Sequence, residues 1–425
     1  MPDLIIRPSA PLRGTVAIPG DKSITHRAII LGGLAEGQTD IIGWVPAEVC
    51  LATLRCVEAL GVRAEETRDS AGAPVLRVTG VGLRGLAEPE DVLHCAGSGT
   101  TIRLMAGVLA GQPFTSVLTG TEPLRRRPMG RVADPLRQMG ATIFGRQDGR
   151  LAPLTIRGGN LRAIRYAMPV ASAQVKSAIL LAGLFAAGDT TVIEPGPSRD
   201  HTERMLRAFG VEVRSGGGEV SLAGDQTLRP PPGGTVVVPG DFSSAAFPLV
   251  AASIVPASEV RLQGVGLIRT RTGLLYLLLA MGASLAPSPP LPLGEGRGEG
   301  GAGDNGGEPA GELRVLHAPL DATEAAGDLI VRAIDEFPIF AVAATQAHGS
   351  TVVREAAELR VKESDRIATV AGELRTMGAQ VDERPDGMVI HGPTRLHGAV
   401  VQCHRDHRLA MSLAVAMTPS FSENP

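Results

Sequence analysis

The sequence of 425 residues predicts an α/β protein made of two similar halves, each built from about three repeated units. Segment 18–35 resembles segment 238–255, which indicates a doubled chain. Segment 177–187 is apolar on every face, as expected of a helix buried on all sides with sheets outside it. A helix pattern that ends in glycine followed by Ala or Val occurs five times, at Gly61, Gly140, Gly210, Gly282 and Gly378.

Each of these glycines is expected to end a helix and to precede a short strand. Glycine just after the last apolar residue of a helical period is a C-cap signal, and short β-like runs follow at 141–144, 211–213 and 379–381. The first three intervals between the glycines are 79, 70 and 72 residues. This spacing is typical of supersecondary units and too long for a small solenoid repeat.

In chain order, the same patterns place the helices and the clearer strands. Helices are expected at 22–35, 48–60, 99–110, 128–139, 172–187, 200–209, 242–254, 268–281, 335–347, 363–377 and 407–417. Short strands are expected between them, among others at 154–157, 219–222, 235–238, 351–353 and 388–390.

The repeat also predicts how the chain divides into lobes. Pro-Gly-Asp turns at 19–21 and 239–241 mark the crossings, so residues 1–19 and 240–425 form a discontinuous lobe I and residues 20–239 form lobe II. Two lobes of three units need six closing glycines, and one more period after Gly378 would end beyond Pro425. We therefore expect the sixth unit, in lobe I, to be truncated.

One interval is longer than the others. The 96 residues between Gly282 and Gly378 include 287–312, which is rich in Pro, Gly and Glu and has few apolar residues to bury. Such a composition predicts a low-complexity, disordered insertion within lobe I.

Composition excludes several classes of function. The net charge of −3 gives no basic field for nucleic acid. The absence of a signal-like start and of a long apolar run predicts a cytoplasmic protein with no membrane contact. The four cysteines have no CxxC spacing, which argues against structural zinc and a disulfide framework. His404 and His407 flank Asp406, but no third ligand motif accompanies them, so we expect no metal site.

Lysine is rare in this chain, and its positions are informative. Lys22, Lys176 and Lys362 are the only lysines beside 38 arginines, and each lies in a polar run at the edge of an apolar helix pattern. Where arginine supplies nearly all other positive charge, a retained lysine indicates a need for a compact, titratable ammonium.

Cationic groups gather where the first predicted helix begins. In GDKSITHR (20–27), Asp21 can cap a helix whose first turn holds Lys22 and Ser23, and Arg27 follows one turn later. Free backbone N–H groups, a hydroxyl and two cations then suit a phosphate or a carboxylate. An ordinary capped helix with solvated charges is the structural alternative.

Similar polar runs occur at other helix starts. AGSGTTIR (96–103) is a glycine-rich turn, and LRRRPM (124–129) is equally readable as a solvated charge run. Carboxylates next to cations stay ionised, and a second carboxylate nearby can hold a proton, which suits proton transfer on an anionic substrate. The remaining runs supply Ser172, Gln174, Arg199, Asp335, Glu336, Lys362, Glu363, Arg366 and Arg408. Together they predict a cation-lined cleft for small, multiply anionic substrates.

Seven motifs now resemble, in order, the EPSP synthase (3-phosphoshikimate 1-carboxyvinyltransferase) family of enolpyruvyl transferases. The resemblance covers residues 3–417 apart from the insertion. It implies two lobes of three βαβαββ units each, with helices buried inside and sheets outside. The motifs are GDKSITHR, SGTTIRL, LRRRPM, SAQVKSAILLAGL, DEFPIFAVAA, LRVKESDRI and DHRLAMSLAVA.

The resemblance also implies an activity. The family transfers the enolpyruvyl group of phosphoenolpyruvate to the 5-hydroxyl of shikimate 3-phosphate and releases phosphate, in the shikimate pathway to chorismate and the aromatic amino acids. The family is the target of glyphosate and uses no metal or organic cofactor. The resemblance also implies a monomer with no nucleic-acid partner. Lobe I would be the phosphoenolpyruvate and catalytic side, and lobe II the shikimate 3-phosphate side.

Carried over motif by motif, the resemblance assigns the site residues. Asp335 would deprotonate the 5-hydroxyl. Glu363 with Lys22 would transfer the protons of the enolpyruvyl methylene and of the departing phosphate. The intermediate would be a tetrahedral ketal, formed while the lobes are closed. Phosphoenolpyruvate would meet Lys22, Gly99, Thr100, Arg127, Gln174, Arg366 and Arg408. Shikimate 3-phosphate would meet Lys22, Ser23, Arg27, Ser172, Ala173, Gln174, Arg199, Asp335 and Lys362.

Departures from the family pattern leave two alternatives open. Ala96-Gly97 replaces the usual Gly-Asn, which removes an amide near phosphoenolpyruvate, and Val49 replaces a common acidic residue. One alternative is a truncated, inactive or binding-only homologue. The other is the sister UDP-N-acetylglucosamine enolpyruvyl transferase, whose reactive Cys and Lys-Asn pair this chain lacks.

Overall fold

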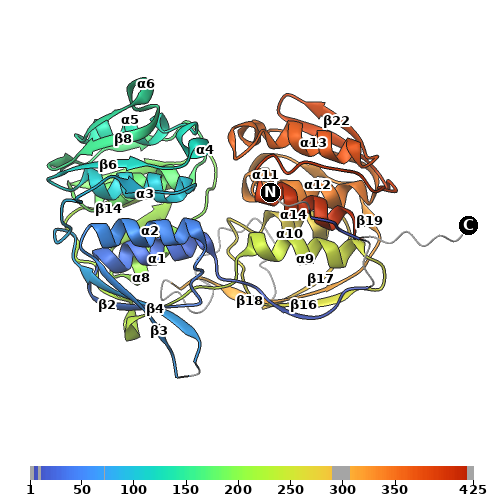
Figure 1. The fold of residues 1–425 in the computed structure, drawn as a ribbon, viewed down its shortest axis with the longest axis horizontal. Helices are drawn as coiled ribbons and strands as arrows, with labels where there is room; N and C mark the ends of the chain where they lie inside the picture. The colour runs from blue at the N-terminus through green and yellow to red at the C-terminus, as the bar shows by residue number, and fades with distance from the viewer. Residues whose placement is uncertain (1–3, 8–10, 71, 290–306, 419–425) are drawn as a thin grey trace, which may run out of the picture. The chain divides into compact units, whose positions relative to one another are not determined.

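The computed structural model describes residues 4–7, 11–70, 72–289 and 307–418 (Figure 1). The chain separates into two compact units. Unit 1 comprises Met1–Pro19, Gly240–Glu295 and Pro309–Pro425, and unit 2 comprises Gly20–Pro239 and Gly296–Glu308. Both combine helices with sheets, so the predicted α/β class is confirmed.

Unit 2 contains three four-stranded sheets that share one topology within the described chain. In each sheet the first two strands are parallel and the other neighbours are antiparallel. The orders are β15 (Thr235–Val237), β2 (Glu36–Ile42), β4 (Pro74–Val81), β3 (Arg63–Arg68); β5 (Leu93–His94), β6 (Thr115–Thr119), β8 (Leu151–Arg157), β7 (Thr142–Gly145); and β10 (Arg165–Ala167), β12 (Asp189–Ile193), β14 (Glu219–Ala223), β13 (Val213–Gly216).

The helices of unit 2 carry its core. α1 (Lys22–Leu34), α3 (Gly99–Ala110) and α7 (Ala173–Gly183) are buried along nearly their whole length, and Figure 1 shows the sheets on their outer side. A helix that is apolar all round has no solvent face, so it is stable only when it is enclosed. The other helices are α2 (Glu48–Ala59), α4 (Glu122–Arg125), α5 (Gly130–Met139), α6 (Arg146–Gly149) and α8 (His201–Ala208), with a 3-10 turn at Pro232–Gly234 and a short pair of β9 (Leu161–Arg162) and β11 (Ala186–Ala187).

Unit 1 contains two sheets of the same topology in its described part. Their orders are β1 (Arg13–Ala17), β16 (Glu259–Gly266), β18 (Ala310–Leu316), β17 (Ser284–Ser288), and β19 (Leu320–Asp321), β21 (Ala347–Val353), β23 (Gly387–Gly392), β22 (Gln380–Arg384), with β20 (Glu324–Ala325) beside β21. Its helices are α9 (Phe242–Ile254), α10 (Gly273–Ala280), α11 (Gly327–Arg332), α12 (Phe337–Thr345), α13 (Arg366–Thr376) and α14 (His407–Ala416), with a 3-10 turn at Ala357–Val361.

The five repeated glycines end helices as predicted. They follow α2, α5, α8, α10 and α13 within two residues, and all have left-handed φ values between 84° and 114°. Because glycine lacks a Cβ, it enters this region without the strain that other residues meet.

The crossings between the units use the same Pro-Gly-Asp turn twice. In unit 2 the amide of Asp21 donates to the carbonyl of Pro239, and in unit 1 the amide of Asp241 donates to the carbonyl of Pro19, both at 2.8 Å. Each aspartate then caps a helix, because the Asp21 carboxylate accepts from the Ile24 amide and the Asp241 carboxylate from the Ser243 amide.

Two expectations need correction. The helix predicted at 172–187 ends at Gly183, since Ala186–Ala187 pair with β9. The helix predicted at 268–281 begins only at Gly273. The first helix is shortened by a non-local strand pairing and the second by a turn, although both segments are apolar.

The predicted disordered insertion at 287–312 is wrong at both ends. Pro287 and Ser288 lie in β17, which pairs with β18, and Ser288 faces Glu312 in this register. Glu308 belongs to unit 2, where its carboxylate is bonded to His201 at 2.8 Å. Residues 290–306 lie outside the described residues. The prediction failed at the ends because strand pairing depends on the partner strand as well as on composition.

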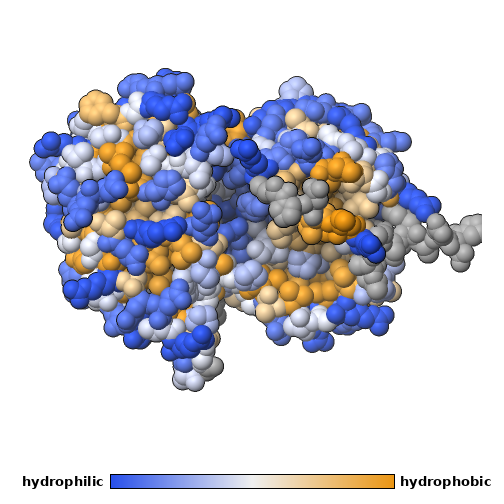
Figure 2. All heavy atoms as spheres, viewed as in Figure 1, coloured by the Kyte–Doolittle hydropathy of each residue, from blue (hydrophilic) through white to orange (hydrophobic). Residues whose placement is uncertain are grey.

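On the face drawn in Figure 2, hydrophilic and apolar residues are mixed on both units. Unit 1 leaves the large apolar side chains of Leu4, Ile5 and Val400 exposed. The buried apolar residues of unit 1 form one core around α9, α10 and α12. None of the helices in the described part of the chain is both long and apolar enough to cross a membrane.

Candidate active site

In unit 2, the start of α1 is built as an anion-binding helix end. Asp21 caps the helix by accepting from the Ile24 amide at 3.0 Å, and Lys22 and Ser23 occupy its first two positions, both half-buried. The amides of a first helical turn have no partner within the helix and carry the positive end of its dipole. The predicted cap is therefore confirmed, and Lys22 lies next to it.

Arg27 lies one turn further, and its guanidinium is held by the protein. It donates to Thr202 Oγ1 at 2.7 Å, to Ser177 Oγ at 2.8 Å and to the Ser23 carbonyl at 2.9 Å. Burial lowers the pKa of Arg27 to about 10, so it stays charged at neutral pH. Arg27 thus fixes the backbone at Ser23 and ties α1 to α7 and α8.

The glycine-rich turn at α3 brings a second set of predicted residues together. Ser98 caps α3 through the Thr101 amide at 3.0 Å, and Gln174 of α7 donates to Thr100 Oγ1 at 2.9 Å. A Cβ on Gly99 would lie 2.8 Å from Nη1 of Arg127. Glycine is therefore needed for the guanidinium to approach this turn.

Arg103 is a member of this cluster that the sequence did not single out. It is buried one turn after Gly99, donates to Gln174 Oε1, and donates to the Pro128 carbonyl at 3.1 Å. The signal was present in the sequence, because Arg103 follows Gly99 at the same i, i+4 spacing as Arg27 follows Ser23.

The Ala96 departure has a structural cost. Ala96 has φ of 48°, in the left-handed region, where a Cβ is strained by about 1–2 kcal/mol. Its carbonyl accepts from the Thr121 amide at 2.8 Å and its amide donates to His94 Nδ1 at 3.3 Å, which holds the turn.

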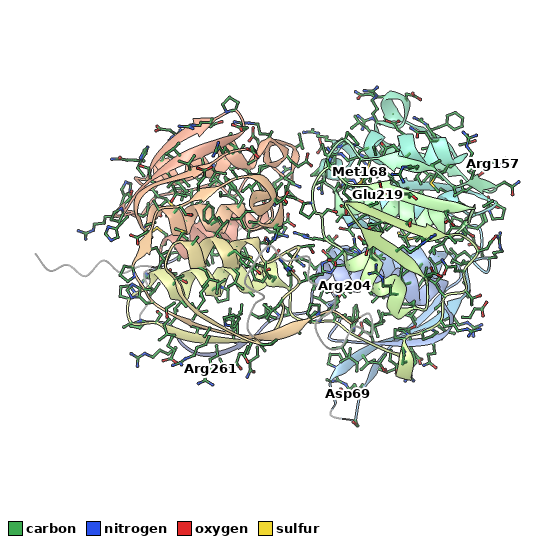
Figure 3. The ribbon with its side chains drawn as sticks, turned by 180° about the vertical axis from the view of Figure 1, so that it is seen from behind. Asp69, Arg157, Met168, Arg204, Glu219 and Arg261 are labelled. Carbon is green, nitrogen blue, oxygen red and sulfur yellow. The ribbon has the colours of Figure 1, made fainter. Side chains whose placement is uncertain are left out.

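The remaining predicted residues of unit 2 also lie at helix starts. Ser172 is the residue before α7 and Ala173 is its first residue. Arg199 is half-buried two residues before α8. On α8 itself, Arg204, labelled in Figure 3, pairs with Asp200 at 2.9 Å.

Lys176 has a structural partner set. Its ammonium lies 2.8 Å from Glu194 and 2.5 Å from Glu203, and the Lys176 and Glu203 side chains are 1% and 2% exposed. Burial opposes the charged form of Lys176, but the two carboxylates outweigh it and raise its pKa. Lys176 therefore stabilises the interior of unit 2 through buried ion pairs. Its retention in a lysine-poor chain is explained by this structural role and does not indicate ligand binding.

In unit 1, Asp335 lies between two arginines. Its carboxylate is 3.6 Å from Arg366 and 3.7 Å from Arg408. Arg366 is fully buried, and its guanidinium also pairs with Glu363 and with Asp406, each at 2.8 Å. Four of the predicted residues are thus in one ionic cluster.

Lys362 stands at the edge of this cluster. It lies 3.8 Å from Glu358, and burial lowers its pKa while Asp335, Glu358 and Glu363 act in the opposite direction. Arg408 lies 3.7 Å from Glu336, and the carboxylates of Asp335 and Glu336 outweigh its burial and raise its pKa. Arg408 is therefore permanently cationic.

Several buried partners in unit 1 were missed. Asp406 was considered only as part of a metal cluster, yet it caps α14 through the Arg408 amide at 2.9 Å and holds Arg366. Asp241 pairs with Arg271 at 2.6 Å, and Ser243 donates to Glu336. The cap signal of an Asp directly before a helix pattern could have found both aspartates. Among the described residues, no cluster of His, Cys, Asp and Glu is arranged to hold a metal ion.

Comparison with known proteins gives one consistent match. The family model described as EPSP synthase (3-phosphoshikimate 1-carboxyvinyltransferase) matches residues 6–419. A 3-phosphoshikimate 1-carboxyvinyltransferase from Desulforamulus reducens is 50% identical over 97% of this chain and 92% of its own length. One from Synechococcus sp. (strain JA-3-3Ab) is 55% identical over 97% of this chain and 89% of its own length.

Solved structures agree. EPSP synthase from Acinetobacter baumannii has a TM-score of 0.81 and 42% identity, covering 98% of this chain and 92% of that chain. The enolpyruvyl transferase NikO from Streptomyces tendae has a TM-score of 0.72 at 18% identity, over 97% of this chain and 90% of that chain, and so shares the fold.

Proposed function

The chain belongs to the EPSP synthase family, and on that premise we propose how its residues carry out the reaction. It transfers the enolpyruvyl group of phosphoenolpyruvate to the 5-hydroxyl of shikimate 3-phosphate and releases phosphate, in the shikimate pathway. The observation that best supports an assignment of roles is Asp335, a carboxylate flanked by two arginine side chains.

Unit 2 supplies the shikimate 3-phosphate side. The start of α1 offers the amides of its first turn together with Lys22 and Ser23 to an anion, and Arg27 keeps this helix end in place. The residues proposed to complete the binding set from unit 2 are Ser172, Ala173, Gln174 and Arg199.

On unit 2, the groups proposed to recognise phosphoenolpyruvate lie at the start of α3. Gly99 and Thr100 form this start, Arg127 and Gln174 lie against it, and Lys22 is the proposed ammonium of the set. On unit 1, the groups proposed for the same substrate are the guanidinium groups of Arg366 and Arg408. Phosphate and carboxylate oxygens on a small substrate are the groups that such donors recognise.

Asp335 takes the proton of the 5-hydroxyl. Two guanidinium groups within 4 Å favour its ionised form, which is the form that a base needs. Lys362, next to it, contributes to shikimate 3-phosphate binding.

Glu363 gives a proton to the enolpyruvyl methylene as the tetrahedral ketal forms and takes a proton back when phosphate leaves. Its carboxylate accepts a hydrogen bond from Arg366 at 2.8 Å. Negative charge on a bound substrate favours the protonated form of a neighbouring carboxyl group, which is the form that can donate a proton. Lys22 stabilises the departing phosphate, and the tetrahedral ketal is the intermediate.

The experiment that tests this function follows phosphate release from phosphoenolpyruvate. We expect release with shikimate 3-phosphate and none with UDP-N-acetylglucosamine. Release only with the nucleotide sugar would identify the sister activity. Calorimetric binding of shikimate 3-phosphate without any release would identify a binding-only homologue.

Three further points of the proposal concern the whole chain. We propose a monomer that acts in the cytoplasm and needs no cofactor. We also propose that the five sheets of one topology are repeated structural units. Gel filtration tests the oligomeric state.

A further inference from the structure

A buried histidine lies on α1 between the proposed ligand residues. His26 directly precedes Arg27, is 2% exposed and has no role in the proposed chemistry. Burial, followed by the charges of Arg27 and Lys22, lowers its pKa to about 3. It is therefore neutral at working pH and must find partners for an uncharged ring.

Those partners form a chain of hydroxyl groups that leads from α1 to α3. His26 Nδ1 lies 2.6 Å from Thr53 Oγ1 of α2, and Thr53 Oγ1 lies 2.7 Å from Thr101 Oγ1 of α3. Thr101 Oγ1 then lies 3.4 Å from the carbonyl of Val49. His26, Thr53 and Thr101 are all buried, so water does not compete for these bonds.

The last acceptor sets the direction of the chain. The Val49 carbonyl can only accept, so the Thr101 hydroxyl donates to it, the Thr53 hydroxyl donates to Thr101, and Nδ1–H of His26 donates to Thr53. Nε2 is then the acceptor nitrogen, and it faces the thiol of Cys50 at 3.9 Å. This order gives His26, Thr53 and Thr101 one donor role each. The thiol of Cys50 has a second acceptor within reach, the carbonyl of Lys22 at 3.8 Å.

The chain ends beside the proposed phosphoenolpyruvate turn. Thr101 follows Gly99 and Thr100 directly, and its amide is the one capped by Ser98. On the other side of this turn, Gln174 of α7 holds Thr100 at 2.9 Å. The first turn of α3 is thus fixed from α7 on one side and from α1, through α2, on the other.

We propose that His26 and Thr53 are positioning residues that hold the phosphoenolpyruvate turn of α3 at a fixed place relative to the shikimate 3-phosphate end of α1. The inference rests on the proposed function, because it names the two substrates of that reaction. Rigid bonds between the two helix starts keep both substrates in register for the transfer step.

The test replaces the middle of the chain. Thr53→Val removes the hydroxyl at nearly constant volume and leaves His26 and Thr101 without their shared partner, whereas Thr53→Ser keeps the hydroxyl. We expect Thr53→Val to raise KM for phosphoenolpyruvate about tenfold, to change KM for shikimate 3-phosphate less than about twofold, and Thr53→Ser to restore the normal value.

Thr39→Val is the matched control. Thr39 is equally buried in unit 2, on β2, and its hydroxyl has no hydrogen-bond partner within the described chain. We expect this variant to keep both KM values. The ¹⁵N shifts of His26 in the unmodified chain supply an independent readout, and they should show a protonated Nδ1 and an unprotonated Nε2 at neutral pH.

The outcomes separate this inference from the proposed function. If the unmodified chain releases no phosphate, the proposed function fails. If it is active and Thr53→Val behaves like Thr39→Val, the positioning role alone is refuted. Equal changes in both KM values that Thr53→Ser does not restore, or an Nε2–H tautomer, would also refute it.

Discussion

The buried, neutral His26 predicts a specific loss of stability in mild acid. Its pKa is about 3 in the folded chain and 6.5 when exposed. Between these values the unfolded chain binds a proton that the folded chain does not bind. The free energy of unfolding must therefore fall as pH decreases below 6.5, and this contribution is absent above it.

The magnitude follows from the two pKa values. At pH 5.0 nearly every unfolded molecule is protonated at His26, and the folded state loses about 2 kcal/mol relative to pH 7.5. His26→Gln removes the titration and keeps an amide that can bond to Thr53. All other ionisable groups are shared by the two proteins, so their contributions cancel in the comparison.

Urea denaturation of both proteins at pH 7.5 and pH 5.0 measures the effect. Trp44 is the only tryptophan, is buried, and belongs to unit 2, so its fluorescence reports the unfolding of the unit that contains His26. We expect the unfolding free energy of the unmodified chain to fall by about 2 kcal/mol more than that of His26→Gln. Equal losses in both proteins would refute the burial argument.

Four further predictions concern the proposed site and its support. Lys22→Ala should lower turnover about 10²–10³-fold in the phosphate-release assay, and Lys22→Arg should also be poor; near-normal kcat/KM for Lys22→Ala would contradict the assignment. Asp335→Asn should bind shikimate 3-phosphate calorimetrically while turnover falls at least about 10²-fold, and rapid single-turnover chemistry would require another base. Gly99→Ala should raise KM for phosphoenolpyruvate and weaken competitive inhibition by glyphosate about tenfold, because its Cβ displaces the Arg127 guanidinium; unchanged inhibition would show that the turn has room. Lys176→Met should cost about 3–5 kcal/mol of unfolding free energy, and adding Glu203→Gln should recover part of it; a neutral single variant would mean that the buried carboxylates are solvated.

Local signals explain why most helices were predicted correctly. Asp21 and Ser98 each stand directly before an apolar helical period, and each accepts a bond from the first turn of its helix. These interactions join residues only three positions apart, so the sequence shows them directly.

The errors arose where the partner is distant in sequence. Ala186 and Ala187 read as helix but pair with Leu161 and Arg162. The ends of the Pro- and Gly-rich segment, such as Ser288, read as disordered but belong to strands. Composition indicates the conformation that a segment prefers in isolation, whereas strand pairing also depends on the neighbouring strand with which the segment can form hydrogen bonds.

The candidate site shows the same difference between local and distant contacts. The motifs identified the proposed ligand residues, and in the structure Asp335, Glu363, Arg366 and Arg408 form one cluster. The supports of that cluster were not predicted. The Asp406 contact with Arg366 spans 40 residues, and no spacing rule connects two such positions.

The two Pro-Gly-Asp turns are followed by helix ends that present different groups. After Asp21, the start of α1 presents Lys22 and Ser23, whereas after Asp241 the hydroxyl of Ser243 bonds to Glu336 and the cap itself pairs with Arg271. At the second turn the counter-ions belong to the chain, so these ion pairs do not depend on any solute concentration. At the first turn the proposed function places an anionic substrate, and a ligand that binds only the folded state adds stability by mass action. A single chain therefore carries a concentration-sensitive version of the turn and a concentration-independent one.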